Sequence, residues 1–247
     1  MGLARGSPWT EMPYSTSVPI TRRTLMRRAY AVGPSYSRDM GLWTEHVVPR
    51  LTDVSLANDQ VSRFRIVVCA GLHGRVLEIG FGSGLNLPHY PREVTAVDAV
   101  EPSDVGWGRS EARRRSAGVP VQRIGLDGER LGAADASYDA ALATFTLCTI
   151  PDVAGALTEV RRVVRPGGAF HFLEHGLAPD PGVVRWQQRL DPLQQRLVGG
   201  CHLARDVPAL VRAAGLEITE LRREYLLGPR VSRPWTYGYV GRAVRPA

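Results

Sequence analysis

The residues that most clearly point to chemistry lie in the stretch GRVLEIGFGSGLNLPHY, residues 74–90, where Glu78 precedes Gly80, Gly82 and Gly84. Glycine lacks a Cβ, so alternate glycines let the backbone turn tightly and lie directly against a ligand. The spacing is G-x-G-x-G, whereas the nicotinamide-binding pattern places its third glycine one residue further along. The acidic residue before the loop either binds a cationic ligand group or caps a neighbouring loop.

A second candidate carboxylate follows in EVTAVDAVEPSD. In related folds an acidic residue about 20 residues after the glycine loop binds ribose hydroxyls. Asp98 lies inside the apolar run, where an unpaired carboxylate is costly to bury, whereas Glu101 ends the run before Pro102. We therefore predict Glu101 as the ribose ligand, with Asp98 as the alternative and Ser103 as the N-cap of the next helix.

Histidine and cysteine side chains offer acid–base and metal chemistry. His175 in FLEHG and His202 in GGCHLAR are the candidate general bases, although a single histidine more often has an ordinary hydrogen-bonding role. Cys69, Cys148 and Cys201 are too few and too scattered for a disulfide framework, and no C-x-x-C pair is present. We expect buried apolar roles for the cysteines, no metal site and a reducing, cytoplasmic location.

The elements that must position these residues alternate along the chain. Hydrophobic periodicity predicts strands near 75–79, 94–100, 121–126, 138–144 and 169–174, and helices near 103–116, 152–164, 181–197 and 206–214. An earlier helix in NDQVSRFRIVVCAGLHG places Val61, Phe64 and Val68 on one face and ends at Gly71. Such alternation predicts parallel strands joined by right-handed crossovers, with ligands at their carboxyl ends.

The C-terminal region departs from a simple dinucleotide-binding pattern. LEITELRREYLLG and WTYGYVGRAV predict two consecutive strands without a crossover helix, so this pair should be antiparallel. The prediction is a Rossmann-like α/β fold with a seven-stranded, mostly parallel sheet and helices on both faces. Residues 1–35, dense in Pro, Ser, Thr and Gly, predict a flexible arm, and residues 36–247 predict a single domain.

Composition limits the class of protein. The chain has 247 residues, 44% of them hydrophobic and 22% charged, as in a globular protein. Its formal charge of +7 comes from dispersed arginines, which we interpret as solvated faces and not as a nucleic-acid surface. No apolar run approaches the roughly 20 residues that cross a bilayer, so we expect no transmembrane segment.

Several longer segments carry a family resemblance: VLEIGFGSGLNLPHYP, TFTLCTIPD, EVRRVVRPGGAFHFLEHG, RWQQRLDPLQQRLVGGCHL and YGYVGRA. Together they resemble the class I S-adenosylmethionine methyltransferases related to the animal alkyl-thiol S-methyltransferases, within the broader UbiE-type group. The resemblance implies the class I methyltransferase sheet, S-adenosyl-L-methionine as cofactor and a small-molecule acceptor such as a thiol. The animal relatives begin with an apolar membrane anchor, whereas this chain begins with a polar, arginine-rich arm.

The resemblance also assigns expected roles to particular residues. Glu78 would hold the methionyl ammonium of the cofactor, directly or through water, and the three glycines of the loop would lie beside it. Asp127 in GLDGERL would accept the adenine amino group next to Gly128, although Asp-Gly also suits an ordinary turn. Thr144, Leu147 and Cys148 would line the junction between cofactor and acceptor.

Methyl transfer demands alignment above all. A sulfonium methyl is already electrophilic, and alignment alone supplies on the order of 7–11 kcal/mol. A base is needed only for an acceptor that arrives protonated, as a thiol does. Two other classes of function stay open. One is a nucleic-acid methyltransferase, which is disfavoured because TFTLCTIPD lacks the Asn/Asp-Pro-Pro-Tyr/Phe sequence typical of enzymes that methylate base amino groups. The other is a protein that binds S-adenosylmethionine or a nicotinamide cofactor without methyl transfer.

Overall fold

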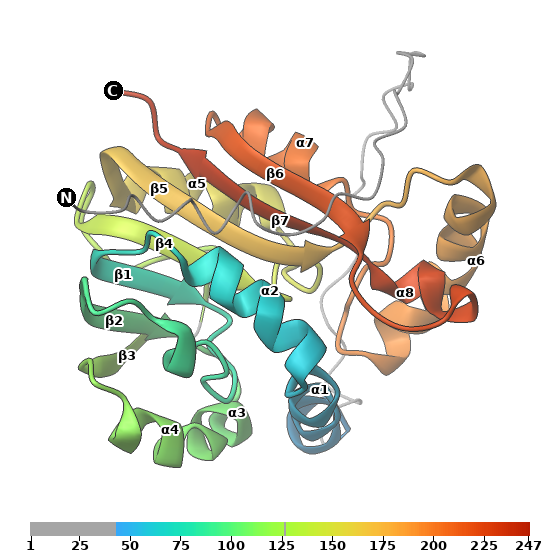
Figure 1. Ribbon diagram of the computed structural model, residues 1–247, viewed down its shortest axis with the longest axis horizontal. Helices are drawn as coiled ribbons and strands as arrows, with labels where there is room; N and C mark the ends of the chain where they lie inside the picture. The colour runs from blue at the N-terminus through green and yellow to red at the C-terminus, as the bar shows by residue number, and fades with distance from the viewer. Residues whose placement is uncertain (1–42, 126) are drawn as a thin grey trace, which may run out of the picture.

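The computed structural model describes residues 43–125 and 127–247. A seven-stranded sheet lies at the centre of the protein (Figure 1). The strand order is β3-β2-β1-β4-β5-β7-β6. Within the described residues, β7 runs antiparallel to both of its neighbours and the other pairs are parallel. The strands are β1 (Gly74–Ile79), β2 (Val94–Val100), β3 (Val121–Gly125), β4 (Tyr138–Thr144), β5 (Val164–His175), β6 (Glu217–Tyr225) and β7 (Tyr237–Val244). The predicted sheet and its antiparallel C-terminal pair are confirmed.

Helices occupy most of the connections. They are α1 (Val48–Leu56), α2 (Asp59–Cys69), α3 (Asp104–Arg109), α4 (Glu111–Ser116), α5 (Val153–Val163), α6 (Pro181–Leu197), α7 (Val207–Ala213) and α8 (Arg233–Thr236), and a π-helical turn (Trp43–Val47) precedes α1. Ser103 caps α3 as predicted, because its Oγ accepts a hydrogen bond from the Gly106 N–H at 3.0 Å.

Two boundaries differ from the sequence prediction. The single helix predicted over 103–116 divides at Ser110, whose Oγ donates to the Trp107 carbonyl at 2.6 Å and so competes with helical hydrogen bonding. Strand β5 begins at Val164 and not near 169, because Val164 pairs with Tyr138 ahead of an irregularity that contains Pro and Gly.

Helices cover both faces of the sheet. Helix α2 lies across one face, and α5 and α7 lie on the other (Figure 1). Val61, Phe64 and Val68 of α2 are buried as the periodicity predicted. On the opposite face, Leu157 of α5 and Val211 of α7 belong to a separate buried cluster. The sheet is thus the middle layer of three, with an apolar cluster buried on each face.

The strand order reverses beside β1, which lies between β2 and β4. In open α/β sheets this reversal leaves a crevice at the carboxyl ends of the strands, where ligands bind. The glycine loop follows β1 at this edge. The predicted arm over residues 1–35 lies outside the described residues. Among the helices that are described, none has the length and apolar character needed to cross a membrane.

Candidate active site

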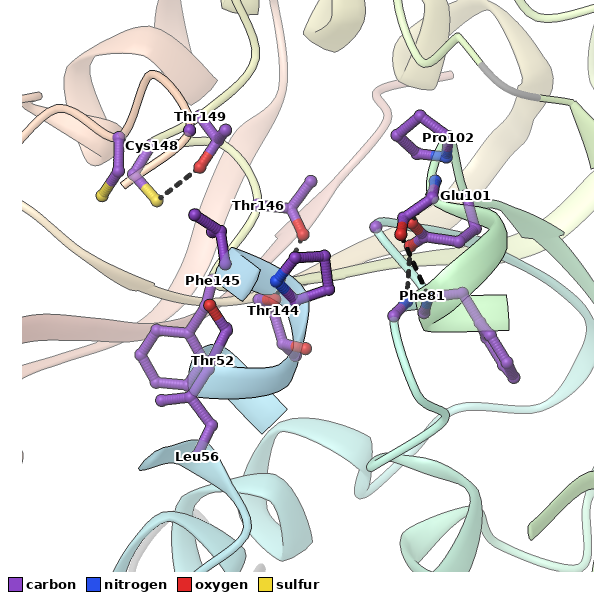
Figure 2. A pocket seen from close by; sticks show the side chains of 18 of the residues that line it. Thr52, Leu56, Phe81, Glu101, Pro102, Thr144, Phe145, Thr146, Cys148 and Thr149 are labelled. Atoms are coloured by element: carbon purple, nitrogen blue, oxygen red, sulfur yellow. Dashed lines mark hydrogen bonds between the residues drawn. The ribbon is translucent and has the colours of Figure 1, made fainter. Parts of the chain in front are cut away.

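A cavity of about 1080 Å³ opens at the carboxyl ends of the parallel strands. Its walls come mainly from α1, from the loops after β1 to β4, from the last residue of β5 and from the segment between α6 and α7. Figure 2 shows Glu101 on one side and Cys148 on the other, with Thr144 and Thr146 between them. We refer to these sides as the Glu101 end and the Cys148 end. The volume suits a ligand of drug-like size or larger.

Glu101, the predicted ribose ligand, lies at the cavity wall. Its Oε2 accepts a hydrogen bond from the Gly82 N–H at 2.6 Å, and its Oε1 accepts one from the Ser103 N–H at 2.7 Å. Burial raises the pKa of Glu101, and the two N–H donors oppose that rise. The carboxylate is therefore held in a fixed position, with acceptor capacity left for ligand hydroxyls.

Asp98, the alternative ribose ligand, has a different environment. Its Oδ2 accepts hydrogen bonds from Arg75 Nε at 2.9 Å and from the Tyr138 hydroxyl at 2.8 Å. Asp98 does not line the cavity, and its partners lie on β1 and β4. The structure thus brings Glu101 and not Asp98 to the cavity, and it gives Asp98 a role in joining strands.

The three glycines after β1 have different surroundings. Gly80 and Gly84 have φ +71° and +76°, which favour glycine, and a Cβ there would crowd Thr146 Oγ1 at 1.8 Å and Leu87 Cδ1 at 3.0 Å. Gly82 has φ +56° and no heavy atom nearer than 4.0 Å to such a Cβ. Gly80 and Gly82 line the cavity, and Gly84 does not. Gly82 is therefore the position where bare backbone borders open space.

Glu78 lies behind the cavity wall, with no exposed surface. Asn86 Nδ2 donates to its Oε1 at 2.7 Å, and the Tyr90 hydroxyl donates to its Oε2. Burial raises the pKa of Glu78 from 4.5 to about 7. Asn86 does line the cavity, so Glu78 holds a residue of the cavity wall in place.

Arg65 is a cavity residue that the sequence analysis missed. It is 3% exposed, and its Nη1 donates to Asn86 Oδ1 at 2.6 Å and to Thr144 Oγ1 at 3.0 Å. Its Nε has no hydrogen-bond partner among the described residues. A largely buried cation at the cavity wall suits an anionic ligand group. The available signal was its position four residues after Val61, on the apolar face of α2.

Asp127 and Gly128, the predicted adenine contacts, line the cavity. Asp127 is exposed, and its Oδ1 accepts a hydrogen bond from the Glu129 N–H at 2.8 Å. That bond is the turn geometry expected of Asp-Gly, and it leaves the second carboxylate oxygen available. Thr144 lines the cavity next to Arg65, and Cys148 lines it as well, whereas Leu147, predicted with them, does not.

The two candidate bases have different positions. His175 lines the cavity, with Nε2 3.1 Å from Cys201 Sγ. Burial lowers the pKa of His175, but the Cys201 thiol and the Glu174 charge outweigh this and leave the pKa raised. His202 does not line the cavity, and its Nδ1 lies 3.4 Å from Asp191 Oδ2. The structure brings only His175 of the two to the cavity.

Glu174, adjacent to His175, is a further buried carboxylate, and the sequence analysis missed it. It accepts hydrogen bonds from the Thr146 N–H at 2.9 Å and the Leu147 N–H at 3.0 Å. Burial raises its pKa to about 7. Glu174 therefore fixes the loop after β4 that carries Cys148 to the cavity.

Comparison with known proteins identifies the family. Residues 77–172 match the family model described as a methyltransferase domain. The human thiol S-methyltransferase TMT1A is 34% identical over 179 residues, which cover 69% of this chain and 72% of that protein. The chain belongs to this methyltransferase family. Rat thiol S-methyltransferase TMT1B is 30% identical over 173 residues, covering 69% of this chain and 70% of that protein.

A solved structure supports the fold of the methyltransferase. An S-adenosylmethionine-dependent methyltransferase of Thermotoga maritima has a TM-score of 0.58 at 21% identity and covers 83% of this chain and 99% of that one. The cofactor of the methyltransferase is S-adenosylmethionine. The cavity residues fit this cofactor, since the Glu101 carboxylate suits a ribose diol, the Arg65 cation suits a carboxylate, and Gly82 leaves space beside its backbone.

The first prediction separates the two ribose candidates. Glu101→Ala should weaken S-adenosylhomocysteine binding at least tenfold, because hydrogen bonds to a charged group contribute roughly 1.5–3 kcal/mol each. Asp98→Ala should leave affinity near wild type but lower the free energy of unfolding by about 1–3 kcal/mol, since it leaves the Tyr138 hydroxyl unpaired. Isothermal titration calorimetry and urea unfolding measure both effects. The reverse pattern would transfer the ribose role to Asp98.

The second prediction concerns the glycine loop. Gly82→Ala should reduce S-adenosylhomocysteine affinity at least tenfold, because alanine strains a backbone at φ +56° and places a methyl group in the open space. Gly108→Ala is the matched control, since a Cβ there meets no atom within 4 Å. Equal affinities for the two variants in calorimetry would remove Gly82 from the cofactor site.

The third prediction follows from the raised pKa of Glu78. The pKa of Glu78 is about 7 in the folded state and 4.5 in the unfolded state. The difference adds to the free energy of unfolding in full below pH 4.5, and this contribution is lost as the pH rises to 7. Glu78→Gln should remove part of the fall in unfolding free energy between pH 5 and pH 8, on the order of 2–3 kcal/mol. Urea unfolding at both pH values measures it, and an unchanged pH dependence would contradict the assignment.

Proposed function

We propose that the methyl acceptor of this methyltransferase is the thiol of a small molecule. The main support is that the cavity extends past Thr144 and Thr146 to an end lined by Cys148, Cys201 and Leu203, all of them buried. Soft and apolar side chains of this kind favour a sulfur-containing ligand over a strongly hydrated one. The two relatives described above are thiol S-methyltransferases, which points to the same acceptor.

The Glu101 end of the cavity is the proposed cofactor site. S-adenosylmethionine supplies an electrophilic methyl group on a sulfonium sulfur. Glu101 would bind the ribose hydroxyls, Arg65 the methionyl carboxylate, and Asn86, held by Glu78, the ammonium. Asp127 would bind the adenine edge. The cofactor would also be bordered by Gly80, Gly82, Gly128 and Thr144. Gly84 does not line the cavity and would only shape the loop.

The Cys148 end is the proposed acceptor site. Glu174 fixes the loop that separates the two ends, and this rigidity would hold the acceptor in line with the methyl group. A thiol has a pKa of about 8.5, so only a few per cent is thiolate at neutral pH. His175 is the residue we propose to promote its deprotonation, because its imidazole lines this end.

The partner and the location belong to the same proposal. A small-molecule acceptor is favoured over nucleic acid. Several arginines in the described part of the chain form ion pairs with carboxylates, such as Arg75–Asp98 and Arg162–Glu159, and so their charge is partly neutralised. The chain's cysteines are all free thiols, which fits a reducing, cytoplasmic location.

A methyl-transfer screen tests the acceptor. Labelled S-adenosylmethionine is incubated with the full chain and with thiols, phenols, quinols, amines or RNA, and products are read by mass spectrometry. Thioether products should dominate. Methylation of amines, quinols or RNA without thioether formation would overturn the proposed acceptor, and S-adenosylhomocysteine binding without any product would favour a binding protein.

The fourth prediction concerns the histidines. His175→Ala should lower thiol methylation at pH 7 by about a hundredfold while leaving S-adenosylhomocysteine affinity unchanged, and high pH should partly restore the rate because the thiol then ionises unaided. His202→Ala is the matched control, because His202 lies beside Asp191 and outside the cavity. A normal rate for His175→Ala, or a large loss only for His202→Ala, would contradict the role of His175.

A further inference from the structure

Three potential metal ligands meet at the Cys148 end. Cys148 Sγ, Cys201 Sγ and a ring nitrogen of His175 all lie within 4.8 Å of one another. They come from three separate parts of the chain, namely the loop after β4, the end of β5 and the segment between α6 and α7. All three line the cavity. Their sequence spacing contains no zinc motif, so only the fold brings them together.

The backbone holds the two thiols in place before any ligand binds. The His202 N–H donates to the Cys148 carbonyl at 2.9 Å, which joins the two loops next to the thiols. The Cys201 N–H donates to the Val198 carbonyl at 3.0 Å. On the other side, the Glu174 carboxylate accepts the Leu147 N–H at 3.0 Å. The cluster is therefore pre-organised by hydrogen bonds from both loops.

The hydrogen bonding within the cluster is weak. The His175 Nδ1 atom is buried and has no hydrogen-bond partner among the described residues. Its Nε2 lies 3.1 Å from the Cys201 thiol, and Cys148 Sγ lies 3.5 Å from Thr149 Oγ1. Thiols are weak donors and weak acceptors, so they compensate poorly for burial of the imidazole. A cation bound by Nε2 and both sulfurs would replace these weak contacts with stronger ones.

We propose that Cys148, His175 and Cys201 bind one Zn²⁺ ion through two thiolates and His175 Nε2. Two sulfurs and one imidazole are a ligand set that selects zinc over hard cations such as Mg²⁺. Three protein ligands are also the number found in catalytic zinc sites, which keep a fourth position open. Because the three residues line the cavity, the fourth position faces the space assigned to the acceptor.

The role of that fourth position rests on the proposed thiol acceptor. The acceptor R–SH loses its proton to solvent as its sulfur binds zinc, so the thiolate is present at neutral pH. Its sulfur electron pair then forms the new bond to the methyl carbon, and the bond from that carbon to the sulfonium sulfur breaks with its pair remaining on sulfur. The products are the thioether and S-adenosylhomocysteine, and zinc is unchanged. His175 would then promote deprotonation of the acceptor thiol as a ligand of the zinc ion, which keeps the role proposed for it above.

Cobalt titration tests the metal site directly. The full chain is stripped with a chelator and titrated with Co²⁺, whose thiolate complexes absorb in the near ultraviolet and whose tetrahedral complexes absorb in the visible. Saturation at one equivalent, with displacement by Zn²⁺, is expected. Cys148→Ser and Cys201→Ser should each weaken binding at least tenfold, whereas Cys69→Ala should bind normally because Cys69 is buried in α2, away from the cavity.

Folding is checked in the same variants through S-adenosylhomocysteine affinity, which should equal that of wild type. The proposal is overturned if the wild-type chain shows no thiolate-to-cobalt absorption, or if the absorption survives in correctly folded Cys148→Ser and Cys201→Ser.

A second experiment separates the metal site from the proposed function. Adding 2-mercaptoethanol to the cobalt-loaded chain should change the visible absorption, because the thiol enters the open position. Zinc removal should lower thiol methylation at pH 7 at least tenfold, with recovery on adding Zn²⁺. Equal methylation with and without zinc overturns the metal role but leaves the thiol acceptor standing. Cobalt binding without thiol methylation by the zinc-loaded chain keeps the site and overturns the proposed acceptor.

Discussion

Buried carboxylates at the carboxyl ends of the strands hold the loops on which the rest of the site depends. Glu101, after β2, binds the N–H groups of Gly82 and Ser103, and Glu174, at the end of β5, binds those of Thr146 and Leu147. A loop N–H that loses its partner in a buried setting costs roughly 1–3 kcal/mol, so these contacts strongly restrain the loops. The sheet fixes the carboxylates, and the carboxylates fix the cavity walls.

This arrangement divides the cavity into two ends with different chemistry. The Glu101 end presents a carboxylate, and Arg65 lies at the wall with a buried guanidinium, which suits a ligand that carries both hydroxyls and a carboxylate. The Cys148 end presents thiols and an imidazole. Phe145 lies between the two ends at φ +53°, an uncommon conformation for a residue with a side chain. Its N–H donates to the Leu173 carbonyl at 2.8 Å, which stabilises the bend after β4.

The sequence predicted the fold well because its apolar periodicity follows the sheet directly. The apolar run at 138–144, for example, forms β4, and the helix that follows it has its apolar residues at helical spacing, so both elements could be predicted from the sequence. The choice of Glu101 over Asp98 also came from local context, since Pro102 marks the strand end. What spacing could not reveal was Arg65, whose buried position depends on partners 21 and 79 residues away. Equally, Cys148 and Cys201 meet only through the packing of two loops, so the expectation of no metal site rested on motif spacing alone.

The most direct test of this division is a crystal structure of the full chain with S-adenosylhomocysteine. The ribose hydroxyls should lie within hydrogen-bond distance of Glu101, with the methionyl carboxylate near Arg65. The cofactor sulfur should face the Cys148 end, with space between it and Cys148 for a small thiol. A ribose bound elsewhere, or a sulfur directed away from the Cys148 end, would contradict the proposed assignment of the two ends.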